Sequence, residues 1–378
     1  SPMSDSLADG EGDPTKEQIR LYERWAQGGT AVSFIGEVQG DPRFPERPGN
    51  LVLTKDTDTA MLHSLMSRGT INGTHLWPQL GHAGALSYLP ISQPQGPSAL
   101  AIEGLQCASM GLEDIQNLPR MYAKAALHAQ TAGFGGVLIH AGHGFLLSQF
   151  LSPLFNRRTD GYGGSIEARC RILLDVINTI RFTVGVFFPV GIRINATDML
   201  EGGLSEAEAL EVVRLLDQTT VDLIDISGGT YFPGAKASSN SSSQAPYFLN
   251  FARQAKAITK VPVLVTGGFK TRDQAVDAIA SGAADMVGLA RAMVLNPNIA
   301  NDWLSEKGGD PTFPKFDSNP EGGITAWYTM RLTALAEDGE HQFDLDLATA
   351  MRMYEERDAQ RCLKWREKFS YLQVSSLG

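Results

Sequence analysis

The chain has 378 residues, of which 43% are hydrophobic and 20% are charged, and this balance is typical of a soluble globular protein with a large core. Its formal net charge of −10 leaves no basic stripe to neutralise phosphates, so we expect no nucleic-acid partner. No apolar run reaches the roughly 18 residues of a membrane span, so we expect no membrane partner. Cys107, Cys170 and Cys362 are widely spaced and odd in number. They indicate reduced thiols and a cytoplasmic protein.

Short apolar runs alternate with helical segments from the start of the chain to about residue 300. The runs are rich in β-branched residues and predict strands at residues 31–35, 73–77, 135–139, 190–194, 221–226, 261–265 and 285–288. The spacing between them predicts helices at residues 15–27, 58–67, 112–132, 165–184, 205–217, 248–259 and 272–280. Continuous apolar strands of this length suit a parallel sheet that is buried on both faces.

This alternation predicts an α/β fold, a (β/α)8 TIM barrel, with residues 1–3 as the end of an additional strand that comes first in the chain, so that the run at 31–35 is strand two and the run at 285–288 is strand eight. The rival is an open doubly wound sheet, which normally carries a Gly-x-Gly-x-x-Gly turn after an early strand. No such turn is present; the glycines at 133, 135 and 136 precede a strand instead of following one.

The pattern changes beyond about residue 302. Residues 308–323 are rich in Pro and Gly and predict a loop, and helices are expected at 326–337 and 345–372. We therefore expect a barrel unit at residues 1–307 and a loop-and-helix extension at 308–378. The extension is expected to pack on the barrel or on a neighbouring subunit, and the second case would make the protein a homo-oligomer.

Polar residues follow the predicted strands, where a barrel enzyme holds its site. They are Gly36, Glu37, Gln79, His140, His143, Arg193, Asn195 and Ser227. Gly267 and Gly268 follow the seventh strand, and Arg291 follows the eighth. Loops at those two strands form the recurrent phosphate site of this fold, so we expect a phosphate there.

The alternative hypothesis is that the histidines form a zinc site, with His82, His140 and His143 as ligands. Carboxylates are sparse at the neighbouring strand ends. The amide of Gln79 and the positive charge of Arg193 do not suit a metal site, so we expect no metal. His75 lies within the third strand and is expected to be a buried core histidine.

The chain resembles the Old Yellow Enzyme family of FMN-dependent NAD(P)H:flavin oxidoreductases, in the branch with an extended C-terminus. The resemblance covers roughly residues 1 to 300. It rests on the segments at 1–4, 79–84, 140–153, 156–165, 191–195, 266–269 and 287–291. The string Phe-Leu-Ser-Pro-x-x-Asn-x-Arg-x-Asp-x-Tyr-Gly-Gly-Ser at 150–165 is its most specific part.

The resemblance implies roles for individual residues. The flavin ring would be lined by Pro2, Met3, Ser4, Gly36 and Glu37, with Gln79 at its pyrimidine end and Arg193 near N1. The FMN phosphate would be held by Gly267, Gly268, Ala290 and Arg291. His140 and His143 would grip the carbonyl oxygen of an α,β-unsaturated substrate. The reductant would be NADPH or NADH, which the sequence does not distinguish.

Two departures from the family pattern are expected to matter. Family members carry a hairpin and most of strand one before the point where this chain starts, and a barrel cannot close without that strand. We expect that those residues precede Ser1 or that another segment fills the gap. The second departure is Phe145, which stands where the family has the Tyr that protonates the substrate carbon, and Phe has no transferable proton.

The sequence thus predicts an FMN-dependent oxidoreductase that passes hydride from NAD(P)H to a small molecule with an activated alkene, Phe145 replacing the usual proton donor. The first alternative is a redox-neutral isomerase or cyclase of specialised metabolism. A metal-dependent barrel lyase or aldolase and a non-catalytic scaffold are the alternatives from other classes.

Overall fold

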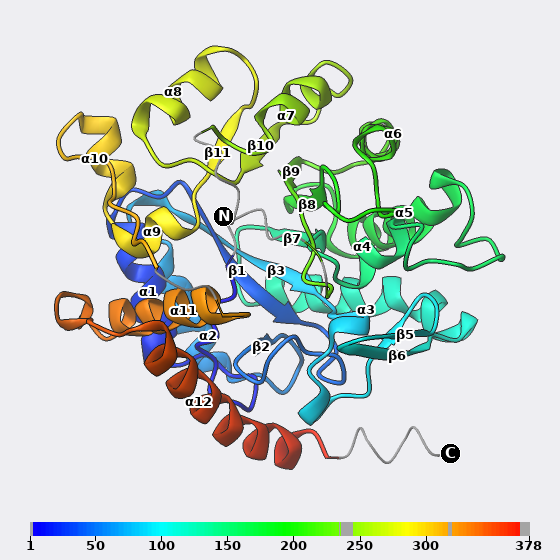
Figure 1. Cartoon of the computed structure of the whole chain (residues 1–378), viewed down its shortest axis with the longest axis horizontal. Helices are drawn as coiled ribbons and strands as arrows, with labels where there is room; N and C mark the ends of the chain where they lie inside the picture. Colours follow the sequence, from blue (N-terminus) through cyan, green and yellow to red (C-terminus); the bar gives the residue numbers. More distant parts are fainter. Residues whose placement is uncertain (1–2, 234, 236–244, 317–319, 371–378) are drawn as a thin grey trace.

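An eight-stranded parallel sheet forms the centre of the computed structural model, which describes residues 3–233, 235, 245–316 and 320–370. Figure 1 shows the strands curving around a common axis with helices on the outside. The order in the sheet is β11-β10-β9-β8-β7-β3-β1-β2. The strands are β1 (Val32–Gln39), β2 (Leu51–Val52), β3 (His75–Gly81), β7 (Val137–Ala141), β8 (Val190–Asn195), β9 (Leu223–Ser227), β10 (Val263–Thr266) and β11 (Met286–Gly288). All seven predicted strands are therefore present.

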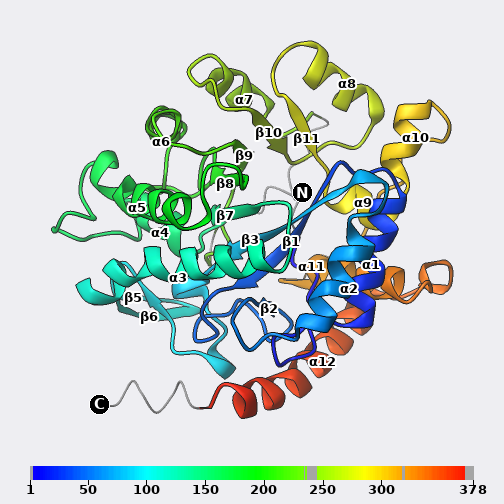
Figure 2. The ribbon, with the colours of Figure 1, turned by 180° about the vertical axis from the view of Figure 1, so that it is seen from behind.

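The helices cover the outer face of the sheet, as the two opposite views show (Figures 1 and 2). Thr15, Asp58, Ser165, Ser205 and Thr271 cap the starts of five of them with their side chains. The helices are α1 (Lys16–Gln27), α2 (Thr59–Gly69), α3 (Leu112–Thr131), α4 (Leu146–Leu151), α5 (Ile166–Val184), α6 (Glu206–Asp217), α7 (Leu249–Lys256), α8 (Arg272–Ala280), α9 (Arg291–Leu295), α10 (Ile299–Ser305), α11 (Gly323–Ala336) and α12 (Leu347–Lys368).

The N-terminal segment lies beside β1. Ser4 forms an isolated parallel bridge with Gly36, and the amide of Asp5 donates to the carbonyl oxygen of Gly36 at 3.0 Å. This is where the end of the first strand was expected. Between β11 and β1 no ladder is recorded within the described ranges, so the shown architecture is an α/β fold with a parallel sheet, and the closed barrel stays a prediction.

A small second sheet was not predicted. It consists of β4 (Gln95–Gly96), β5 (Leu100–Ile102) and β6 (Leu105–Ser109) in the order β4-β6-β5. Leu100 and Cys107 from this sheet pack with Phe155 and Phe232, which follow α4 and β9. The sheet thus lies over the same end of the barrel strands as the polar residues described below.

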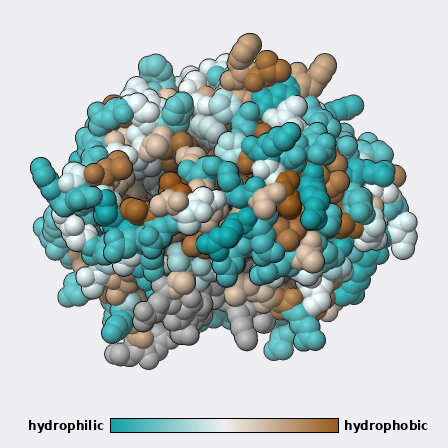
Figure 3. All heavy atoms as spheres, turned by 90° about the horizontal axis from the view of Figure 1, so that it is seen from above, coloured by the Kyte–Doolittle hydropathy of each residue, from teal (hydrophilic) through white to brown (hydrophobic). Residues whose placement is uncertain are grey.

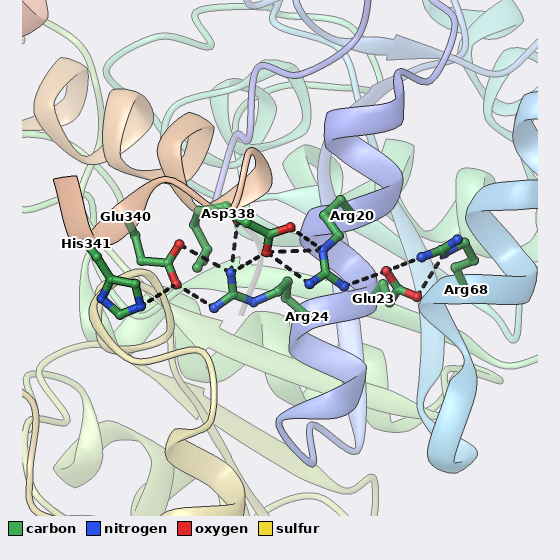
Figure 4. Close-up of polar contacts among 8 residues, drawn as sticks. Arg20, Glu23, Arg24, Arg68, Asp338, Glu340 and His341 are labelled. Atoms are coloured by element: carbon green, nitrogen blue, oxygen red, sulfur yellow. Dashed lines mark hydrogen bonds and ion pairs between the residues drawn. The ribbon is translucent and has the colours of Figure 1, made fainter. Parts of the chain in front are cut away.

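The C-terminal helices pack on the barrel helices of their own chain. Arg20 and Arg24 on α1 form ion pairs with Asp338, at 2.9 and 2.8 Å, just after α11 (Figure 4). Arg24 also pairs with Glu340 at 2.6 Å. The pairs with the half-exposed Asp338 contribute about 0–1 kcal/mol each, whereas the Arg24–Glu340 pair is largely buried, and apolar contacts such as Leu332 in the main core add to the attachment. The boundary between residues 307 and 308 remains a prediction.

Two local expectations were wrong. The third strand begins at His75, not at residue 73, because Ile71–Gly73 forms a 3-10 turn in which Asn72 has a φ of 58°. His75 is exposed at the start of β3 instead of buried in the core. The side chain of Leu76, which points to the other face, is buried there.

The surface is mixed in character. Figure 3 shows hydrophilic side chains over most of one face, with hydrophobic ones in small groups between them. In the part of the chain that the structure describes, no helix is both long and apolar enough to cross a membrane. Cys107, Cys170 and Cys362 are buried free thiols, as predicted.

Candidate active site

Polar side chains gather at the carboxyl ends of β7, β8 and β9. His140 on β7 lies in register with Arg193 on β8, which lies in register with Asp225 on β9. One layer further along, Asn195 is in register with Ser227. Residues two apart on a strand share a face, so these two layers point to the same side of the sheet. The strand register therefore brings together residues that lie far apart in the sequence.

The imidazoles of His140 and His143 face each other. Nε2 of His140 lies 3.2 Å from Nδ1 of His143, and Nε2 of His143 lies 2.9 Å from the hydroxyl of Ser227. Nδ1 of His140 contacts Oε1 of Glu37, although without the alignment of a hydrogen bond. Burial lowers the pKa of both histidines well below its usual value, and the charge of Arg193 adds to this. Both rings are therefore neutral, with one N–H each.

The backbone of His143 is held in an uncommon conformation. Its φ is 58°, which a non-glycine residue adopts only when its surroundings fix it. Its amide donates to Oδ1 of Asn195 at 2.9 Å, and its carbonyl oxygen accepts from the amide of Tyr231 at 3.1 Å. These contacts from two other strand ends set the direction of the His143 ring.

Glu37 is a buried carboxyl beside the histidine pair. The Gln79 amide donates to its Oε1 atom. Burial raises the pKa of Glu37 to about 8, although the hydrogen bond from Gln79 and the charge of Arg193 act in the opposite direction. At neutral pH Glu37 is thus mainly a protonated acid that can donate a hydrogen bond.

Arg193 forms a buried ion pair with Asp225. The Arg193 Nε atom donates to Oδ2 of Asp225 at 2.7 Å, and the Thr266 hydroxyl donates to Oδ1 at 3.0 Å. Both charged side chains are almost inaccessible, at 1% and 0% exposure. Removing one partner of such a pair typically costs about 3–5 kcal/mol, so Asp225 is needed to hold the buried cation at this end of the sheet.

Phe145 lies directly before α4 and against the histidines. Its side chain is 3% exposed, and its ring centroid is 4.9 Å from that of His140. Tyr231, after β9, has its ring centroid 5.9 Å from those of both His143 and Phe145. Tyr231 is 63% exposed, and its hydroxyl lies within electrostatic reach of Arg193. The apolar ring of Phe145 therefore has a phenol as its neighbour.

Gly267 and Gly268 follow β10 with φ values of 120° and 83°. A Cβ atom on Gly268 would lie 3.1 Å from Cα of Pro246, so the backbone passes too closely for a side chain. Arg291 begins α9 after Ala290, and its guanidinium lies 5.7 Å from the ring centre of Tyr328 on α11. Such a turn beside an arginine can hold a phosphate.

Several buried polar atoms near the N-terminal segment have no hydrogen-bond partner. They include Oγ of Ser4, Oε1 of Gln79 and Oε2 of Glu37. Met3 packs partly buried against the main core, and Ser4 is bridged to Gly36. Pro2 lies outside the described residues. Unpaired amide and hydroxyl atoms at one strand end fit a planar ligand with polar edges, such as a flavin.

Sequence reasoning left four contributors out of the candidate site. Asp225 lies inside an apolar run, and only its register with Arg193 reveals its role. Asn195 and Ser227 were noted at strand ends without a function, and Tyr231 was not among the predicted residues. His82 does not join a metal site: its ring stacks on Phe44 at 4.4 Å. Within the described ranges no cluster of His, Cys, Asp or Glu suited to a metal ion is found.

The fold and the polar groups at the carboxyl ends of its parallel strands are typical of an α/β enzyme. The model of the NADH:flavin oxidoreductase / NADH oxidase family matches residues 3–305. The chain therefore belongs to this family, the Old Yellow Enzyme family, and is an oxidoreductase that uses FMN with NADH or NADPH. This membership overturns the alternatives of a metal-dependent lyase or aldolase and of a non-catalytic scaffold.

Individual relatives agree with this assignment. The chain is 31% identical over 330 residues to the NADH-dependent flavin oxidoreductase iliE of Hypocrea jecorina, covering 78% of this chain and 82% of that protein. It is 34% identical over 375 residues to iliE of a Neonectria species, covering 88% of this chain but only 47% of that protein. The old yellow enzyme homologue of Zymomonas mobilis shares the fold, with a TM-score of 0.71 at 22% identity, over 87% of this chain and 93% of that one.

Proposed function

We propose that this chain reduces the alkene of α,β-unsaturated carbonyl compounds with electrons that pass from NADH or NADPH through FMN. The observation that carries the proposal is the facing pair of His140 and His143. Both rings are neutral, and the two nitrogens, 3.2 Å apart, can both donate to one carbonyl oxygen that lies to one side, about 2.9 Å from each, in place of the contact between the rings. Polarising that carbonyl makes the β-carbon of the alkene electrophilic.

We propose that FMN lies over the carboxyl ends of the strands, where the unpaired atoms of Ser4 and Gln79 face it. When bound, FMN supplies the hydride chemistry between the nicotinamide and the substrate. Arg193 places a fixed cation where negative charge gathers on reduction. The barrel unit at residues 1–307 would supply every contact. The proposed FMN-binding residues are Pro2, Met3, Ser4, Gly36, Glu37, Gln79, Arg193, Gly267, Gly268, Ala290 and Arg291.

Net reduction also needs a proton on the α-carbon, and Phe145 has none to give. Tyr231 is the phenol beside it, and its 63% exposure lets the phenolate regain a proton from solvent. We assign the proton transfer to Tyr231. The hydride then forms the C–H bond at the β-carbon, the Tyr231 proton forms the one at the α-carbon, and the alkene π bond is lost.

Phe145 itself favours a second candidate function. If protonation is slow, the hydride addition would reverse after rotation about the α–β bond of the enolate, and the product would be a geometric isomer of the alkene formed without net use of NAD(P)H. A substrate with a second electrophile would cyclise instead. This candidate depends on Tyr231 not reaching the α-carbon.

The test is turnover of a cyclic enone under nitrogen, with NADH or NADPH consumption and products followed together. The proposal predicts one reductant consumed for each saturated ketone. His140→Ala should lower kcat/KM by about 10²-fold or more, because a donor to developing charge is lost. An isomerised product without reductant consumption would support the second candidate.

A further inference from the structure

Glu37, His140, His143 and Ser227 form one continuous chain of contacts across three strand ends and the turn after β7. Oε1 of Glu37 contacts Nδ1 of His140. Nε2 of His140 lies within hydrogen-bond distance of Nδ1 of His143, and Nε2 of His143 lies within hydrogen-bond distance of the Ser227 hydroxyl. Every ring nitrogen of the pair therefore faces another polar group. The protonation of one member restricts that of the next, since a neutral imidazole has one donor and one acceptor nitrogen.

A carbonyl between the two rings needs an N–H from each. His140 must carry its proton on Nε2, so its Nδ1 must accept a hydrogen bond. His143 must carry its proton on Nδ1, so its Nε2 must accept one. Glu37 lies at Nδ1 of His140, and Ser227 lies at Nε2 of His143. These two residues therefore determine whether each nitrogen can accept a hydrogen bond.

The two outer neighbours differ in what they can do. The Ser227 hydroxyl both donates and accepts, so it suits either tautomer of His143. Glu37 can donate to Nδ1 of His140 only while it carries a proton. Ionised Glu37 would draw the His140 proton to Nδ1 and leave Nε2 as an acceptor, turned toward a carbonyl oxygen that it would repel.

We propose that Glu37 is a positioning residue that sets the His140 tautomer and thereby selects neutral carbonyl ligands, with Ser227 completing the arrangement at His143. This inference rests on the proposed function, in which the histidine pair holds a carbonyl. It assigns Glu37 a role toward His140 in addition to the flavin contact proposed above.

The surroundings of Glu37 keep it protonated at neutral pH. Burial raises its pKa to about 8. The titratable and charged groups around it come from five elements, and Arg193 is already neutralised by Asp225. They are His140 on β7, Arg193 on β8, Glu46 after β1, Tyr122 on α3 and Tyr231 after β9.

The experiment measures binding of cyclohexenone to the FMN-bound oxidised protein by calorimetry between pH 6 and 9.5. The parent should bind with constant affinity below about pH 8 and lose affinity above it, by up to about tenfold per pH unit. Glu37→Gln should bind independently of pH, because the Gln amide donates to Nδ1 at every pH. Glu46→Gln changes a neighbouring carboxyl, in the loop after β1, that is not part of the chain of contacts, so it is the matched control and should keep the transition.

Ser227 gives a second, different signature. Ser227→Ala should weaken binding several-fold at all pH values without moving the transition, because a hydrogen bond to the neutral His143 ring is lost. Ser227→Thr keeps the hydroxyl and should restore affinity.

A direct reading of the tautomers separates this inference from the proposed function. In protein labelled with 15N-histidine, the shifts of His140 should report Nε2–H at pH 6.5 and Nδ1–H at pH 9.5, and only Nε2–H in Glu37→Gln. If His140 keeps one tautomer in the parent throughout, the inference is wrong whether or not the enone binds. If the tautomer changes as expected but no enone binds, the inference holds and the proposed carbonyl site fails.

Discussion

The backbone amide of His143 donates a hydrogen bond to Oδ1 of Asn195 at 2.9 Å. The Asn195 amide nitrogen donates in turn to Asp198 at 3.0 Å and to the carbonyl oxygen of Gly229 at 2.9 Å. Only one orientation of the Asn195 side chain satisfies all three contacts. Asn195 therefore links the turn after β7 to the turn after β9. It also holds the backbone of His143, whose φ is 58°.

Asn195→Ala should loosen His143 without removing any group that touches the substrate. Loss of these hydrogen bonds is worth about 1–3 kcal/mol, so kcat/KM for an enone should fall by about 10–100-fold. FMN retention should stay at the parent level, since no Asn195 contact reaches the proposed phosphate site. A variant with unchanged kcat/KM would show that the His143 backbone keeps its conformation without this contact.

Phe145 and Tyr231 are neighbours, so the phenol can be moved from one position to the other by substituting both residues. Tyr231→Phe should slow net reduction by about 10²-fold or more, because general-acid help is typically worth about 10²–10⁴-fold. Phe145→Tyr in that background should restore it. Rapid-mixing reoxidation of the reduced protein by an enone isolates this step, and the rate of reduction by NADH should be the same in all variants. Equal reoxidation rates in parent and Tyr231→Phe would rule out Tyr231 as the donor.

The proposed phosphate site can be tested by FMN retention after dialysis. Arg291→Ala should weaken binding by about 10–100-fold, as expected for a lost charge-assisted hydrogen bond of about 1.5–3 kcal/mol. Arg272→Ala is the control, because Arg272 on α8 binds Glu306 and the carbonyl oxygen of Trp303. Stoichiometric FMN in Arg291→Ala would show that the phosphate lies elsewhere.

Gly268→Val should also release FMN, because its Cβ would meet the Pro246 backbone at 3.1 Å. Gly282→Val is a matched control: Gly282 also has a positive φ, of 68°, but a Cβ there meets nothing within 4 Å. Both variants should lose about 1–3 kcal/mol of unfolding free energy from backbone strain. Only the first should lose FMN, and equal FMN content in the two would contradict the close approach.

Glu46 should contribute a loss of stability as pH rises above 5. Burial raises the pKa of Glu46 to about 7 from an ordinary value of 4.5. Between those values the folded state keeps a proton that the unfolded chain releases, so unfolding becomes more favourable by up to about 1.4 kcal/mol per pH unit. Urea unfolding of the FMN-bound parent and of Glu46→Gln at pH 5, 6 and 7 isolates this contribution, because the buried histidines add the same opposing slope to both proteins; the stability of the parent relative to the variant should fall as pH rises. Equal slopes in the two proteins would mean that Glu46 is ionised in the folded protein.

The strands were predictable because each is buried on both faces and reads as a continuous apolar run, such as residues 190–194. The short strands β2, β4, β5 and β6 were missed because they depend on tertiary pairing more than on an apolar period. The site residues at strand ends could be predicted because barrel enzymes place their active sites at the carboxyl ends of the strands, and because the family resemblance indicates the same residues. Asp225 could not be found in that way, since its charge is tolerated only because Arg193 lies beside it in the register. Tyr231 likewise becomes a candidate only when the fold brings it to Phe145.

The central claim is that this chain completes alkene reduction although Phe145 replaces the usual proton donor. The most direct measurement is an anaerobic single turnover in which the flavin absorbance is bleached with one equivalent of NADH or NADPH and one equivalent of cyclohexenone is then added. We expect the oxidised flavin spectrum to return and one equivalent of cyclohexanone to form. A flavin that stays reduced, or that is reoxidised without any saturated ketone, would contradict it.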